Sequence, residues 1–186
     1  MQAEHTRNMV ELTPVYSKLQ VQKTIVEVAN KINRDGFIAP AMLIAVLNGG
    51  AYFFDKIKRL IKTDFQTDSI QVKSYQGTKS SGDINILKDI SGNIDGKDCL
   101  VIDDILDSGA TSFYLNKLLE KRNPARIRYA YLVVRENAAK YDVAIDYQAF
   151  GLKGNDFIVG CGMDLDGSYR ELDGIYKISN YKTAAQ

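Results

Sequence analysis

Three aspartates and a run of small or hydroxyl-bearing residues lie close together in the stretch VIDDILDSGATS, residues 101–112. The apolar residues before the aspartates predict a buried strand, and the segment from Ser108 to Ser112 predicts the turn that enters a helix. The start of a helix offers free backbone N–H groups and the positive end of the helix dipole, which together bind phosphate. Gly109 lets such a ligand approach closely, and the hydroxyl groups of Ser108, Thr111 and Ser112 can add hydrogen bonds.

The carboxylates of Asp103, Asp104 and Asp107 would repel that phosphate unless they faced another part of the ligand. Sugar hydroxyls, a magnesium ion, or a carbon that becomes positive in the transition state would suit them. A phosphorylated ribose satisfies all three requirements. An isolated Asp-Ser-Gly would more simply cap a helix beside solvated aspartates, but the full twelve-residue combination is more specific than that. It also differs from the Walker pattern, because it contains no Gly-Lys-Ser/Thr, and it lacks GxGxxG.

The composition predicts one soluble globular domain. The chain has 186 residues, and its 24 Lys and Arg against 23 Asp and Glu leave a formal net charge of +1, which argues against a nucleic-acid partner. No apolar stretch approaches the roughly 18 to 20 residues that span a bilayer, so no membrane partner is expected. Cys99 and Cys161 each lie in an apolar run without a disulfide pattern, which predicts a reducing, cytoplasmic setting.

The single histidine limits the chemistry that is available. His5 lies in a polar N-terminal segment, which argues against Ser-His-Asp, Cys-His and His-based zinc sites. Any general acid or general base in this protein is therefore expected to be a carboxylate, a lysine or a tyrosine.

Hydrophobic patterning places these residues on an alternating series of helices and strands. A helical repeat runs from Val15 to about Asp35, and residues 41–50 form an apolar run that ends in two glycines, as a strand buried on both faces would. Residues 51–61 again predict a helix. Residues 68–90 contain two strand-like halves around Gly-Thr-Lys-Ser-Ser-Gly, which we interpret as a mobile flap between antiparallel strands.

The order strand, loop, helix, strand recurs over residues 95–139 and predicts a βαβ unit. The expected fold class is therefore α/β, with a central, mostly parallel sheet flanked by helices and with ligands at the carboxyl ends of its strands. Both glycine-bearing stretches, residues 48–50 and 103–112, fall at such ends. The tail, residues 156–179, predicts a short strand, a polar loop and a further strand.

Four motifs together resemble one enzyme family. VIDDILDSGATS is similar to the phosphoribosyl-diphosphate signature of the type I phosphoribosyltransferases. VLNGGAYFFDKI (46–57), VKSYQGTKSSGDI (72–84) and DFIVGCGMDLDGSYREL (156–172) resemble the first loop, the catalytic flap and the purine-binding hood of the hypoxanthine-guanine phosphoribosyltransferases. The resemblance covers residues 40 to 180, with the motifs in the family's order.

The resemblance implies an activity. The expected reaction transfers the 5-phosphoribosyl group from 5-phosphoribosyl 1-diphosphate to hypoxanthine or guanine, giving IMP or GMP and pyrophosphate in purine salvage, with Mg²⁺ as cofactor. It also implies a homodimer or homotetramer. The expected organisation is a single domain over residues 1–186, with a core over about 15–150, a hood over about 151–186 to which the N-terminus can contribute, and a flap over about 74–84.

Carried over to this sequence, the family's motif makes Asp107 the general base that takes the proton near nitrogen 7 of the purine. Asp103 and Asp104 would hold the ribose hydroxyls or the metal ion. The 5′-phosphate would lie on Ser108, Gly109, Ala110, Thr111 and Ser112.

Residues from the other three motifs supply the pyrophosphate site. Asn48 and Gly49 would hold pyrophosphate through their backbone, next to a cis peptide bond between Leu47 and Asn48. Arg170 would contact the pyrophosphate oxygens with its guanidinium group. Ser74 and Tyr75, in the flap, would close over the reaction and exclude water.

The hood would hold the purine. Phe157 would stack on its ring, Ile158 would contact its edge through backbone groups, and Asp164 would contribute there and help to hold magnesium at the pyrophosphate. Arg135 stands where the family usually has a lysine that donates to the 6-oxygen of the purine. Arginine can also donate to a carbonyl, so 6-oxopurines remain the expected substrates, but the preference among hypoxanthine, guanine and xanthine stays open.

Other interpretations are possible for several of these features. The chain could be a nucleotide-sensing regulator that binds nucleic acid, although its near-neutral charge argues against this, or a phosphoribosyltransferase for adenine or another base. Phe157 alone could be a core residue, and Arg170 alone could form a surface ion pair with Glu171 or Asp166. The aromatic residues 52–54 fit a core or a subunit interface.

Overall fold

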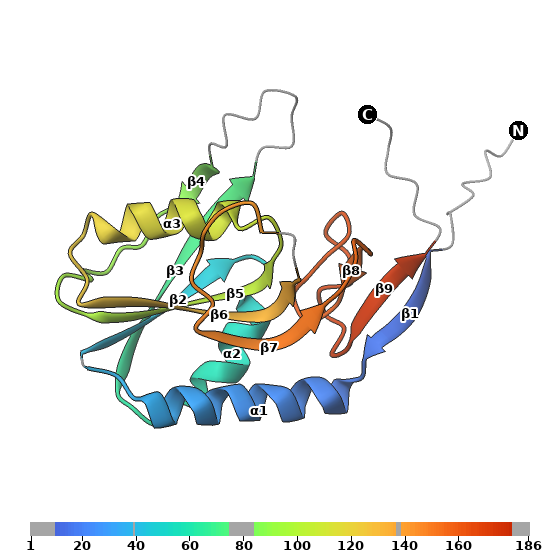
Figure 1. Ribbon diagram of the computed structural model, residues 1–186, viewed down its shortest axis with the longest axis horizontal. Helices are drawn as coiled ribbons and strands as arrows, with labels where there is room; N and C mark the ends of the chain where they lie inside the picture. The colour runs from blue at the N-terminus through green and yellow to red at the C-terminus, as the bar shows by residue number, and fades with distance from the viewer. Residues whose placement is uncertain (1–9, 39, 75–83, 137–138, 180–186) are drawn as a thin grey trace, which may run out of the picture.

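The described part of the protein folds into a large and a small β-sheet with three helices (Figure 1). The computed structural model describes residues 10–38, 40–74, 84–136 and 139–179. The larger sheet contains, in spatial order, β4 (Ile84–Lys88), β3 (Phe65–Ser74), β2 (Ala41–Leu47), β5 (Asp98–Leu106), β6 (Arg126–Arg135) and β7 (Tyr147–Leu152). The smaller sheet contains β1 (Glu11–Tyr16), β9 (Ile175–Ser179) and β8 (Ile158–Val159).

The larger sheet is mostly parallel, as the alternating pattern predicted. Strands β3, β2, β5, β6 and β7 run parallel, and β4 pairs antiparallel with β3 at one edge. Helices α1 (Lys18–Asp35) and α2 (Ala51–Lys58) cover one face, and α3 (Ala110–Glu120) covers the other (Figure 1). Alternate residues of the central strands point to the two faces, so β2 and β5 contribute to two separate hydrophobic cores. The predicted fold class is confirmed.

Helix α1 begins three residues later than the hydrophobic repeat predicted. Val15 lies in β1, and the Ser17 side chain accepts a hydrogen bond from the Gln20 backbone N–H while the Gln20 side chain accepts one from the Ser17 N–H. This reciprocal capping satisfies backbone donors at the helix start and fixes the boundary at Lys18.

The smaller sheet joins segments from both ends of the chain. β1 pairs antiparallel with β9, with Glu11 opposite Ser179. The Tyr16 hydroxyl donates to the Gly151 carbonyl at 3.0 Å, and its ring stacks on Phe150 with centroids 4.1 Å apart. These contacts attach the smaller sheet to β7 of the larger one.

Strand β5 is longer than expected, and this changes the setting of its aspartates. The sequence predicted that the strand ends near Ile102, but β5 stays paired with β6 as far as Leu106 opposite Val134. Its pairing with β2 stops at Ile102, so the two strands separate beyond that point. Asp103 and Asp104 therefore lie within a strand that is open on its β2 side.

This opening is the topological switch point of the sheet. β2 leads through α2 to β3 on one side, and β5 leads through α3 to β6 on the other. Open α/β sheets bind ligands at such a point, beyond the carboxyl ends of the strands.

The remaining expectations about elements have mixed outcomes. Phe53 is fully buried in the core, and Tyr52 and Phe54 pack against it. β3 and β4 form the predicted antiparallel pair, but residues 75–83, which make up most of the predicted flap, lie outside the described residues.

Within the described part of the chain, none of the helices has the length and apolar character needed to cross a membrane.

Candidate active site

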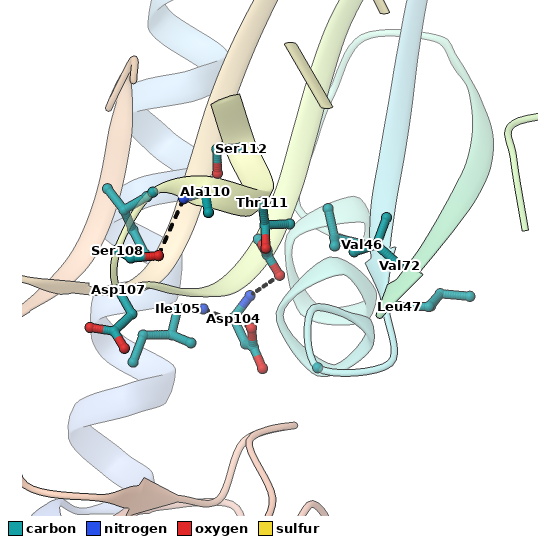
Figure 2. A pocket seen from close by; sticks show the side chains of 14 residues that line it. Val46, Leu47, Val72, Asp104, Ile105, Asp107, Ser108, Ala110, Thr111 and Ser112 are labelled. Carbon is teal, nitrogen blue, oxygen red and sulfur yellow. Dashed lines mark hydrogen bonds between the residues drawn. The ribbon is translucent and has the colours of Figure 1, made fainter. Parts of the chain in front are cut away.

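A cavity of about 310 Å³ opens at the switch point (Figure 2). It is lined by the ends of β2 and β3, by Gly49, and by every residue from 103 to 112. In Figure 2 the side chains of Asp104, Asp107, Ser108 and Thr111 lie around it. The structure thus gathers the predicted ribose and phosphate residues at one site.

The start of α3 is built to receive an anion. Gly109 precedes the helix with φ of 83°, and as a glycine it has no side chain with which to cap the first turn. Ser108 Oγ accepts a weak hydrogen bond from the Ala110 N–H at 3.4 Å. Ser112 is buried, and its hydroxyl oxygen accepts a hydrogen bond from the Tyr131 hydroxyl at 2.8 Å, which ties the first turn to the sheet.

The two strand aspartates are neighbouring carboxyl groups that burial makes harder to ionise. Asp103 is buried, and one of its carboxylate oxygens accepts the Asp104 N–H at 2.9 Å. Burial raises the pKa of the Asp103 carboxyl well above its usual range, and the neighbouring Asp104 raises it further. Burial also raises the pKa of Asp104, although its hydrogen bond with Asp103 and the charge of Arg170 act in the opposite direction. Hydroxyl donors or a cation brought to this pair would relieve the repulsion.

The glycine loop after β2 lies directly against these aspartates. The expected cis peptide bond between Leu47 and Asn48 is present. A Cβ added to Gly49 would lie 1.7 Å from Asp104 Oδ2, and one added to Gly50 would lie 2.6 Å from the Val46 carbonyl oxygen. Only glycine allows this close approach, so the loop backbone faces the cavity.

The turn at residues 160–163 reaches the same loop from the side of the smaller sheet. Gly162 has φ of 101°, and a Cβ there would lie 2.0 Å from the Gly49 carbonyl oxygen. Arg170 Nη1 donates to the Gly162 carbonyl, and Arg170 Nη2 pairs with Asp164 Oδ1, each at 2.6 Å. The ion-pair partner of Arg170 is therefore Asp164 rather than Glu171 or Asp166.

Arg135 joins the two sides of the site. The side chain of Arg135 is only 9% exposed and that of Asp107 is 63% exposed, and Arg135 Nε lies 3.0 Å from Asp107 Oδ1. Its terminal nitrogens donate to the carbonyl oxygens of Gly154 at 2.6 Å and Asp156 at 3.2 Å. Phe157 follows directly and is 43% exposed, so it is not a core residue, while Ile158 is buried in β8.

The family model of the phosphoribosyl transferase domain matches residues 14–166. The chain belongs to the phosphoribosyltransferase family. A hypoxanthine-guanine-xanthine phosphoribosyltransferase of Tritrichomonas foetus is 35% identical over 90% of this chain and 92% of its own length. The hypoxanthine-guanine phosphoribosyltransferase of Mycobacterium tuberculosis is 37% identical over 82% of this chain and 79% of that protein. A crystal structure of a hypoxanthine-guanine phosphoribosyltransferase from Bacillus anthracis has a TM-score of 0.85 and 32% identity, covering 92% of this chain and 99% of that one.

Sequence reasoning missed one supporting segment of this phosphoribosyltransferase site. The Lys140 N–H donates to the Ser108 carbonyl at 2.8 Å, and a Cβ on Gly109 would lie 3.4 Å from the Tyr141 carbonyl oxygen. The Tyr141 ring packs against that of Phe113, with centroids 5.0 Å apart. This loop supports the turn at residues 108–112 from outside, and the aromatic Tyr141 between Lys140 and Asp142 was its only signal in the sequence.

Two residues predicted for the phosphoribosyltransferase flap stay untested. Ser74 is the last residue of β3, and Tyr75 lies outside the described residues. Asn48 lies in the glycine loop, where its side-chain oxygen accepts a hydrogen bond from Gln71 at 3.4 Å.

Proposed function

We propose that this phosphoribosyltransferase transfers the 5-phosphoribosyl group from 5-phosphoribosyl 1-diphosphate to a 6-oxopurine. Hypoxanthine and guanine would give IMP and GMP, with release of pyrophosphate, in purine salvage. The observation that carries the proposal is that the acidic end of β5, the start of α3 and the glycine loop share one cavity at the switch point. The names of the similar proteins from Tritrichomonas foetus and Mycobacterium tuberculosis support the choice of base.

The cavity accounts for the sugar phosphate. The 5′-phosphate lies on the backbone N–H groups and hydroxyls of residues 108–112, where the helix dipole favours negative charge. The ribose 2′- and 3′-hydroxyls donate to Asp103 and Asp104, whose pKa values are raised mainly by burial and, for Asp103, also by the neighbouring carboxylate.

Pyrophosphate lies on the cavity side of the glycine loop, next to the turn at residues 160–163 that packs against this loop. Gly49 presents its backbone, and Arg170 supplies a guanidinium group beside it. Both loops therefore face the leaving group, whose charge increases as the bond to the anomeric carbon breaks.

Magnesium fits this arrangement as a partner of the substrate. No cluster of three or more metal-binding side chains occurs among the residues that the structure describes. Mg²⁺ usually binds through one or two carboxylates together with substrate phosphates, and Asp164, Asp103 and Asp104 offer such carboxylates. The ion supplies positive charge to the pyrophosphate oxygens when it is bound.

The chemistry requires a proton acceptor on the purine side. As the purine nitrogen bonds to the anomeric carbon and pyrophosphate leaves, the proton near nitrogen 7 passes to Asp107. This carboxylate lines the cavity and stays accessible, while the carboxylates of Asp103 and Asp104 face the ribose and can stabilise positive charge on it.

The purine lies against Phe157 in the smaller sheet. Phe157 is exposed enough to stack on a ring, and Ile158 fixes the backbone beside it because it is buried in β8. Arg135 donates to the 6-oxygen through an N–H group other than the two that donate to backbone carbonyls. Asp164 contributes to the same purine site. This arrangement favours 6-oxopurines over adenine.

The assembly and the compartment are part of the same proposal. We expect a homodimer or homotetramer. In a hypoxanthine phosphoribosyl transferase of Trypanosoma cruzi, at 28% identity, the C-terminal region has a role in the oligomeric state, which supports this expectation. A reducing cytoplasm suits the chain because both cysteines are free and buried.

A steady-state assay of each purine with 5-phosphoribosyl 1-diphosphate and magnesium tests the function. We expect turnover of hypoxanthine and guanine and little of adenine. Asp107→Asn should lower kcat by about 10² to 10⁴ because it removes the base. Asp64→Asn, at an exposed position outside the cavity, is the matched control and should leave kcat unchanged.

The outcomes separate two claims. Absence of turnover with every base would overturn the proposed function. Normal kcat in Asp107→Asn would leave the function standing and remove Asp107 from its role as base.

A further inference from the structure

Arg135 is a buried arginine whose partners come from two distant segments. It ends β6, and its guanidinium group contacts Asp107, at the end of β5, as well as the carbonyl oxygens of Gly154 and Asp156, between β7 and β8. Two of the five N–H groups of the guanidinium donate to these carbonyl oxygens, and Nε forms the ion pair with Asp107. If Arg135 only donated a hydrogen bond to the 6-oxygen of the purine, it would not need these contacts within the protein.

The segment that Arg135 holds has little burial of its own. All five residues from Lys153 to Phe157 are exposed, and Gly154 has φ of 79°. Lys177 pairs with Asp156 at 2.8 Å, but both side chains are substantially exposed, so this pair contributes little. The buried guanidinium of Arg135 therefore holds segment 153–157 more strongly than the exposed Lys177–Asp156 pair does, because charge-assisted hydrogen bonds are stronger away from water.

We propose that Arg135 is a positioning residue that holds segment 153–157 and Asp107 in one fixed arrangement. The stacking residue Phe157 and the base Asp107 then approach the purine from two sides with their separation already set. This inference rests on the proposed function. It assigns Arg135 a task that lysine cannot perform, because one ammonium group cannot reach three acceptors spread across the plane of a guanidinium fork.

Arg135→Lys is the decisive variant, because it keeps a charge and a donor but loses the planar fork. We expect the KM for hypoxanthine and for guanine to rise by about 10- to 100-fold, to similar extents, with a lower kcat. The KM for 5-phosphoribosyl 1-diphosphate should change by less than about threefold, since the 5′-phosphate and pyrophosphate residues do not contact Arg135 in the proposed site. Amide hydrogen exchange within residues 153–157 should become faster.

Two further variants make the comparison specific. Arg135→Met removes the charge as well and should show at least the same losses. Arg122→Lys changes an arginine that pairs with Asp89 outside the cavity, and it should leave all of these values unchanged. Amide hydrogen exchange in β5 and β6 shows whether each variant stays folded. If Arg135→Met does not fold, the results for Arg135→Lys alone decide the test.

Near-normal purine KM values in Arg135→Lys, together with unchanged exchange in residues 153–157, would overturn the inference while the proposed function stood. If the wild-type protein turned over no purine, the proposed function would fail instead. The exchange comparison would then still decide whether Arg135 holds the segment.

Discussion

Single residues on β5 show how burial separates a structural acid from a functional one. Asp98, at the start of the strand, is fully buried, pairs with Arg126 at 2.5 Å and Arg128 at 3.2 Å, and accepts the Ile38 N–H at 3.0 Å. Asp103, near the other end, is also buried, but its neighbour is a second carboxylate, which raises its pKa. A compensated charge stabilises a fold, whereas an uncompensated one costs stability and marks a place where a ligand completes the site.

Asp98→Asn should destabilise the protein strongly. The change keeps the shape of the side chain but leaves two arginine charges without their partner, and breaking a buried pair in this way costs about 3–5 kcal/mol. Urea unfolding measures the loss. Asp55→Asn breaks the exposed pairs with Lys58 and Arg59, and it should cost about 0–1 kcal/mol. Equal losses in the two variants would contradict the structural role of Asp98.

At the scale of elements, the site depends on how closely two loops approach each other. The turn at residues 160–163 packs on the glycine loop because Gly162 has no side chain, and Arg170 fixes the Gly162 carbonyl. The smaller sheet thereby sets the position of the glycine loop, which follows β2 of the larger sheet. A change that separates the two loops should affect chemistry as well as stability.

Gly162→Ala tests this packing, with Gly167→Ala as its control. Both changes place a Cβ at positive φ, which costs about 1–2 kcal/mol. The Cβ at 162 would also lie 2.0 Å from the Gly49 carbonyl oxygen, whereas the one at 167 would meet nothing within 4 Å. We expect kcat/KM for 5-phosphoribosyl 1-diphosphate to fall at least about tenfold in Gly162→Ala and to stay unchanged in Gly167→Ala. A displaced glycine loop would no longer hold the substrate in the geometry that the reaction needs. A similar fall in both variants would argue against the loop contact.

At the scale of the whole molecule, the two cores hold several groups that must stay uncharged. Burial raises the pKa of Cys99 to about 11 and that of Cys161 to about 11, from an ordinary value of 9.0. Burial also raises the pKa values of Tyr52, Tyr129 and Tyr131. The folded state therefore favours the protonated form of each group.

Stability should fall in alkaline solution. In the unfolded chain the thiols lose their protons near pH 9, while in the folded protein they keep them until about pH 11, so the free energy of unfolding decreases as pH rises through this window. Urea midpoints measured between pH 7 and pH 10.5 test this. The double variant Cys99→Ala/Cys161→Ala should show a smaller decrease between pH 9 and pH 10, where the tyrosines contribute less. An unchanged pH dependence would contradict the thiol contribution.

The sequence predicted the parts of this molecule that depend on local pattern. Residues 101–112 and 48–50 combine apolar runs, glycines and helix-start residues within a few positions, so the strand, the turn and the helix could be placed. The extension of β5 through Asp103 and Asp104 could not, because pairing with β6 outweighs the low strand propensity of aspartate. The contacts of Arg135 with Gly154 and Asp156 depend on where two loops meet in space, which no local pattern records.

The pairing of β1 with β9 has a consequence for biosynthesis. On the ribosome β1 is made before the larger sheet and β9 after it, so β1 waits for its partner while the strands and helices between them are translated. The start of α3, where we propose that the sugar phosphate binds, is thus translated well before β9. The surface proposed for the base includes β8, which pairs with β9, so we expect binding of both substrates to require completion of the smaller sheet.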